Sequence, residues 1–192
     1  MKRIGKLIFI LGCLLIAASF ALLLLLRLQT RQAERANTEM VQTIEGIFPD
    51  RREGAIDPDR DAEMPALEIQ GEDYIALLEI PAYGLKLPVG SIWDKGTVRL
   101  HPCRFSGSAY VGTLGVGGYD QPGQFAFFDS IQPGAAVTLT DMTGTTFSYT
   151  LEQVERRSSA ETEILMDSGA ELTLFVRDAR LLEYIILRCA AR

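Results

Sequence analysis

The sequence contains few residues of the kinds that build metal sites and disulfide frameworks. Its 192 residues include three cysteines and one histidine, and no two cysteines lie close together along the chain. A Cys/His metal site typically contains a closely spaced pair of cysteines, and this sequence has no CxxC and only one histidine, so no metal is expected, and no other cofactor is indicated. Basic residues are also in the minority, with 19 Lys and Arg against 25 Asp and Glu. Because nucleic-acid binding depends on a basic surface, this balance argues against a nucleic-acid partner.

The N-terminal region lacks charge over one long apolar run. No charged residue occurs between Leu7 and Leu26. A helix of about 20 apolar residues spans the hydrocarbon core of a bilayer, and the run lacks the small-residue cleavage site of a signal peptide. We therefore expect an uncleaved, single-pass membrane anchor over 7–27. The three basic residues within 1–6 predict a cytoplasmic N-terminus, with the rest of the chain on the extracytoplasmic side of the cell membrane.

Residues 28–73 contain few large apolar side chains. Up to about residue 47 they show a weak helical periodicity, which predicts a stalk that continues the membrane helix. Residues 48–73 are dense in Pro, Asp, Arg and Glu. Such a segment has too little apolar surface to fold alone, so a linker is predicted here.

Strand signals dominate residues 74–192, and long helical patterns are absent from them. Two alternating runs, AVTLT and TFSYTLEQV, flank a turn at 141–144 and predict a hairpin. Two further runs of strand character, ELTLFV and YIILRCA, lie near the C-terminus. Many short strands joined by turns favour a mostly-β domain, either a closed barrel or a sandwich. Trp93 and the phenylalanines are expected in its core.

The order of four segments in this domain resembles the sortases, the membrane-anchored cysteine transpeptidases of Gram-positive bacteria. In chain order the segments are YIALLEIPAYGLKLPV, HPCRFSGSAYVGTLGVGGYDQPGQFAFFDSI, IQPGAAVTLTDMTGTTFSYTLEQVE and ELTLFVRDARLLEYIILRC. The third segment departs from the family pattern at Ala135, where an Asp is usual. The resemblance implies a sortase-type closed β-barrel with short helices over 74–192, carried on an N-terminal transmembrane helix.

The resemblance also implies an active site of three residues. In the family a cysteine thiolate attacks the peptide, a histidine protonates the leaving amine and an arginine stabilises the oxyanion. Here the strand that would end in the cysteine reads LTLFVR, which puts Arg177 at that position. The histidine position falls on Tyr119, and the arginine position falls on Tyr184, with Glu183 as the alternative one residue away. A guanidinium is no nucleophile, and a phenol is a poor proton shuttle at neutral pH.

These substitutions favour a sortase-like protein without transpeptidase activity. The resemblance then implies a membrane-tethered binding or scaffolding module at the cell surface, whose partner is a sorting peptide of a surface protein or an active sortase. One alternative is an active cysteine transpeptidase or hydrolase that attaches surface proteins to the cell wall or to pili with non-standard residues. A second alternative is a purely structural, stalked β-domain.

The cysteines leave two further interpretations open. Cys103 lies two residues from the single histidine, His101, and the two could form a relocated nucleophile pair. Pro102 between them does not orient the pair, so a structural Cys103 is the simpler interpretation. Cys103 could also form a disulfide with Cys189, because both are expected in an oxidising compartment. Cys13 lies within the expected membrane span.

Overall fold

The computed structural model describes residues 2–48, 50–128, 130–158, 169–178 and 183–192. The chain divides into two compact units, 1–36 and 37–192. Helix α1 (Lys2–Ile47) runs through the first unit and ends in the second. A search of the described residues finds no helical stretch with the length and hydropathy needed to cross a bilayer. The membrane anchor over 7–27 stays a prediction.

After the end of α1, the described part of the second unit consists of strands and two single-turn 3-10 helices. Their bounds are β1 (Arg52–Glu53), β2 (Leu67–Ile69), β3 (Glu72–Ile80), η1 (Pro81–Tyr83), β4 (Leu85–Gly90), η2 (Thr97–Arg99), β5 (Cys103–Ser106), β6 (Leu114–Tyr119), β7 (Ala136–Asp141), β8 (Thr145–Ser158), β9 (Leu172–Asp178) and β10 (Glu183–Ala191).

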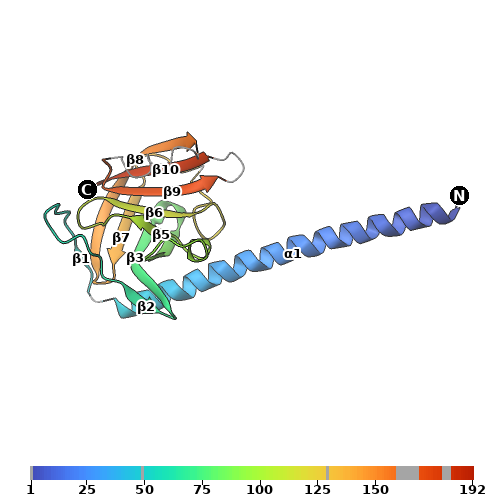
Figure 1. Cartoon of the computed structure of the whole chain (residues 1–192), viewed down its shortest axis with the longest axis horizontal. Helices are drawn as coiled ribbons and strands as arrows, with labels where there is room; N and C mark the ends of the chain where they lie inside the picture. Colours follow the sequence, from blue (N-terminus) through green and yellow to red (C-terminus); the bar gives the residue numbers. More distant parts are fainter. Residues whose placement is uncertain (1, 49, 129, 159–168, 179–182) are drawn as a thin grey trace. The chain divides into compact units, whose positions relative to one another are not determined.

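Among the described residues, eight strands close into a barrel (Figure 1). The order β8-β10-β9-β6-β5-β4-β3 forms one continuous sheet, and β7 closes it by pairing with both β3 and β8. The pairs β6–β9 and β4–β5 are parallel. The predicted mostly-β closed barrel with short helices is confirmed.

Alternation along the strands separates an inner face from an outer face. On β9, Leu174 and Val176 belong to the apolar core of the barrel, as do Ile185 and Leu187 on β10. Successive side chains of a strand point to opposite faces of a sheet. The residues that alternate with these core positions, which include Arg177 and Tyr184, therefore face outward.

The predicted hairpin is formed by β7 and β8, and a buried carboxylate organises its turn. Asp141 is fully buried. Its Oδ1 accepts hydrogen bonds from the backbone N–H groups of Thr143 (2.8 Å) and Thr145 (2.9 Å), and its Oδ2 accepts one from the Tyr110 hydroxyl (2.6 Å). A buried carboxylate is costly unless it is fully hydrogen-bonded, and here both oxygens have partners.

The predicted linker differs from the observed structure. Residues 37–47 at the end of α1 pack against the barrel, where the fully buried Ile44 contacts a cluster that contains Tyr74 and Leu77. Residues 50–73 contribute β1, β2 and the first residues of β3 to the sheet. The segment has too little apolar surface to fold alone, as expected, but it orders itself on the barrel instead of forming a linker.

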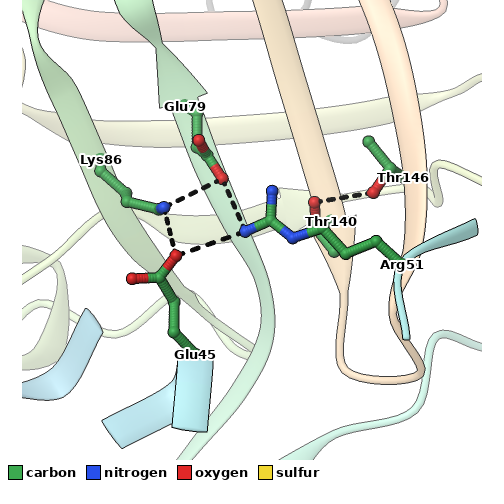
Figure 2. Close-up of polar contacts among 6 residues, drawn as sticks. All are labelled: Glu45, Arg51, Glu79, Lys86, Thr140 and Thr146. Atoms are coloured by element: carbon green, nitrogen blue, oxygen red, sulfur yellow. Dashed lines mark hydrogen bonds and ion pairs between the residues drawn. The ribbon is translucent and has the colours of Figure 1, made fainter. Parts of the chain in front are cut away.

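Four charged side chains add to this docking (Figure 2). Glu45, near the end of α1, pairs with Lys86 on β4 and with Arg51, and Glu79 on β3 pairs with the same two cations. Single exposed ion pairs contribute only about 0–1 kcal/mol. The network therefore fixes the position of the helix end more than it stabilises the fold.

Candidate binding groove

Tyr119, Arg177 and Tyr184 form one row across three neighbouring strands. In the parallel pair β6–β9, Tyr119 is the register partner of Arg177. In the antiparallel pair β9–β10, Arg177 is the register partner of Tyr184. Glu183, the alternative position, instead faces Asp178. Neighbouring strands lie about 4.8 Å apart, so the three positions derived from the sequence meet at one edge of the barrel.

This row lines an open groove of about 720 Å³. Strands β6, β9 and β10 form one side of it, and the segment around η2 forms another. The lining residues are Trp93, Lys95, Val98, Arg99, Gly118, Tyr119, Asp120, Phe175, Arg177 and Tyr184. The volume is within the range of small-ligand sites.

An aromatic cluster forms the apolar part of the groove. The ring centroid of Phe175 lies 5.6 Å from that of Trp93 and 6.0 Å from that of Tyr184. Gly117 on β6 permits this packing, because a Cβ atom there would lie 2.3 Å from a Trp93 ring carbon and 2.5 Å from one of Phe175. The expectation that Trp93 is a core residue is confirmed in part: Trp93 packs against the buried Phe175 and Ile186, but it is only half-buried and also lines the groove.

A buried amide connects the two sides of the groove. Gln124 is 2 % exposed. Its Oε1 accepts a hydrogen bond from the Tyr119 backbone N–H (2.9 Å), and its Nε2 donates to the carbonyls of Val98 (3.4 Å) and Arg99 (3.1 Å). The end of β6 and the η2 turn are thereby held together.

The η2 turn is also ordered from its N-terminal side by Asp94. Oδ2 of Asp94 accepts hydrogen bonds from the Thr97 N–H (2.9 Å), the Thr97 hydroxyl (2.9 Å) and the Gly96 N–H (3.1 Å). These bonds, with the Thr97 N–H first, hold the pKa of Asp94 below its usual range. The turn that carries Lys95 and Arg99 is therefore a preorganised wall.

A buried ion pair lies further along the outer face of the same sheet. Arg188 on β10 is 7 % exposed and donates to Glu155 on β8 (3.3 Å) and to Thr173 on β9 (3.1 Å). Arg188 therefore has a carboxylate partner. Among the described side chains, Arg177 takes part in no ion pair.

Cys103 and His101 lie together but outside the groove. Sγ of Cys103 is 3.8 Å from Nδ1 of His101, and both residues are buried. Burial raises the pKa of Cys103 to about 12 and lowers the pKa of His101. Both groups are therefore neutral at physiological pH. A cysteine nucleophile needs a thiolate, so this geometry favours the structural interpretation of Cys103.

The possible disulfide between Cys103 and Cys189 is not formed; both are free, buried thiols. Cys189 on β10 belongs to the inner core. Cys103 on β5 is the register partner of Gly117, whose missing side chain faces the outer aromatic cluster. Two strands, β9 and β6, separate β10 from β5, and three strand spacings of about 4.8 Å each exceed the Cα separation of about 7 Å that a disulfide tolerates.

Several groove residues were not identified from the sequence. Lys95 and Arg99, which line the groove, and Gln124, which supports it, lie far in sequence from β9 and β10, and only the fold brings them to the row. The one local signal was Asp94 three residues before Thr97, a pairing typical of an ordered turn.

The fold and groove together define a closed eight-stranded barrel with a cleft on the outer face of three adjacent strands. No protein-family model and no curated protein matches the sequence. Solved structures do match. Sortase C-3 from Streptococcus pneumoniae is 17% identical with a TM-score of 0.56, and the match covers 85% of this chain and 84% of that one. A lid mutant of sortase A from Corynebacterium diphtheriae is 18% identical with a TM-score of 0.56, covering 63% and 71%.

A third match is the sortase C of Clostridium perfringens with the C-terminal cell wall sorting motif. It is 16% identical with a TM-score of 0.54, and the match covers 63% of this chain and 71% of that one. These identities are low, but three sortases, one of type A and two of type C, share the architecture. The chain therefore has the sortase fold.

Proposed function

We propose that this chain is a sortase-like protein that binds peptides in the groove at Tyr119, Arg177 and Tyr184 without cleaving them. One observation carries the proposal: the three positions that the resemblance assigns to cysteine, histidine and arginine do meet at one edge of the barrel. The residues there are a cation between two phenols, which can hold a polar ligand but cannot form a thioester. The sorting motif bound to the Clostridium perfringens sortase C supports a peptide as the ligand class.

The cysteines support the absence of covalent catalysis. Cys103 and Cys189 are both buried, and burial raises the pKa of each thiol to about 12. Neither lines the groove. A reaction that used either thiol would therefore require that the structure around the buried cysteine open and that its thiol ionise.

The proposal includes a membrane location. The uncharged run over 7–26 and the basic residues that precede it support a single-pass anchor with the barrel on the extracytoplasmic side. Carbonate extraction of membranes should leave the full chain in the pellet and release a chain that lacks residues 1–27. Release of both would overturn the anchor.

The test of function uses the purified full chain, a peptide that contains a sorting motif, and an amine acceptor. We expect no cleaved peptide and no thioester adduct by mass spectrometry, but saturable binding. Turnover would overturn the non-catalytic proposal, and a Cys103→Ala variant would show whether that thiol is responsible. The absence of both turnover and binding would leave the barrel a structural domain and would overturn the peptide-binding proposal.

A further inference from the structure

We propose that the groove selects peptides that end in a free α-carboxylate, with an apolar C-terminal side chain seated on the aromatic cluster. This inference rests on the proposed peptide-binding function and adds the class of ligand. It follows from how charge and apolar surface are distributed over the lining residues.

The groove is cationic in a strongly acidic unit. Residues 37–192 contain 13 Lys and Arg against 24 Asp and Glu, a net charge of −11. Among the described residues that line the groove, three are cations, Lys95, Arg99 and Arg177, and one is acidic, Asp120. A local excess of positive charge against such a background indicates an anionic ligand.

The groove cations come from two sides that are fixed relative to each other. Arg177 stands on β9 between two phenols, and the guanidinium of Arg99 lies 6.0 Å from the ring centroid of Tyr119. Gln124 ties the Arg99 carbonyl to the backbone of Tyr119. Arginine pairs with carboxylates through two parallel hydrogen bonds, so two arginines carried on backbone segments that are held together suit a carboxylate.

The apolar half of the groove favours a peptide end over a polyanion. Trp93, Phe175 and Tyr184 present aromatic rings beside the cations. A polyanion would use the charge but not the rings, and the unit's net charge of −11 would repel it over distances of about 8–10 Å. A C-terminal residue with an apolar side chain uses both halves, because its carboxylate and its side chain branch from one carbon.

The chain supplies its own probe for the test. Trp93 is the single tryptophan of the whole sequence and it lines the groove. Its emission and its quenching by acrylamide therefore report on occupancy of the groove directly. The experiment titrates the full chain with tripeptide libraries that are acetylated at the N-terminus, randomised at all three positions, and differ only in a C-terminal acid or amide.

We expect the acid library to bind roughly tenfold or more tightly than the amide library, the size of one charge-assisted hydrogen bond. Arg177→Gln should remove this difference. Arg192→Gln, just beyond the opposite end of β10 and bonded to Thr150, is the matched control and should keep it. Both substitutions are at exposed sites, and thermal melts verify folding.

The other outcomes separate this proposal from the proposed function. Equal binding of acid and amide, lost in Trp93→Ala, would keep the peptide-binding function and overturn carboxylate selection. Absence of binding by either library would overturn both. A third arm with inorganic polyphosphate covers the remaining case: binding of polyphosphate that depends on Arg177, without binding of the acid library, would assign the groove to polyanions and overturn the proposal.

Discussion

The backbone N–H of Tyr119 donates a 2.9 Å hydrogen bond to the side-chain Oε1 of Gln124, and Nε2 of Gln124 donates to the carbonyl of Arg99. A single buried side chain thus joins the strand edge to the η2 turn. Asn37, at the base of α1, reaches the same region, because its Nδ2 donates to the carbonyls of Leu100 (3.2 Å) and Gly123 (3.3 Å). The groove is therefore supported from behind by two buried amides.

Replacing Gln124 should disrupt the groove wall. Gln124→Ala leaves the Tyr119 N–H and the Val98 carbonyl without this partner, whereas the Arg99 carbonyl keeps its bond from Gln121 Nε2 (2.7 Å). Each unsatisfied buried group costs about 1–3 kcal/mol. We expect a loss of unfolding free energy of about 2–4 kcal/mol in urea titrations, and greater accessibility of Trp93 to acrylamide. Gln124→Glu keeps the shape but removes the donor, so it should also destabilise. Wild-type stability in both variants would show that the amide is not structural.

The buried turn of the β7–β8 hairpin should be equally sensitive. Asp141→Ala removes the acceptor of two backbone N–H groups and of the Tyr110 hydroxyl. Hydrogen bonds to a charged group contribute about 1.5–3 kcal/mol each, and the losses are not additive, so we expect a destabilisation of about 3–5 kcal/mol by urea unfolding. Tyr110→Phe, which removes one of these bonds, should cost less. Equal effects of the two variants would contradict the role of the turn bonds.

Local patterns were enough to predict a mostly-β domain, and the resemblance supplied the closed barrel and the row. Alternation predicted the β7–β8 hairpin, because its two runs and their turn lie within one stretch of chain. The resemblance, read residue by residue, brought Tyr119 together with Arg177 and Tyr184.

Tertiary packing determined what the sequence did not reveal. The segment 37–73 looked unable to fold because its apolar partners, such as Tyr74 and Leu77, belong to the barrel. From the sequence, Trp93 looked like a core residue. Nothing in the local sequence around Trp93 indicates that Gly117 on β6 leaves room for its ring on the outer face of the barrel. The bridging role of Gln124 depends on three backbone groups from two distant segments.

Alkaline pH should destabilise the fold through the buried thiols. Burial raises the pKa of Cys103 and of Cys189 from 9.0 to about 12. Between these values the unfolded chain releases protons that the folded chain retains. The stabilisation is therefore complete below pH 9 and is lost as the pH rises toward 12, by about 1.4 kcal/mol per pH unit for each thiol.

The Cys103→Ala variant isolates this effect. Burial also raises the pKa of Tyr74 to about 12, so the wild-type slope has a tyrosine contribution above pH 10. The variant keeps that contribution and should lose stability less steeply than the wild type in urea titrations from pH 8.5 to 10.5. Parallel curves for the two proteins would mean that Cys103 ionises normally in the folded state.

A thiol placed at the groove should behave differently from the native cysteines. Arg177 is exposed, whereas Cys103 and Cys189 are buried. In a Cys13→Ser background, Arg177→Cys should introduce one rapidly alkylated thiol, while the two native thiols react only on unfolding.

Adding Tyr119→His to this variant puts an imidazole on the register partner of position 177, on the neighbouring strand about 4.8 Å away. An adjacent imidazolium lowers a thiol pKa, so the alkylation profile should move to lower pH. Tyr83→His, the same change outside the row, should leave the profile unmoved, and an identical shift in both variants would contradict the adjacency of positions 119 and 177.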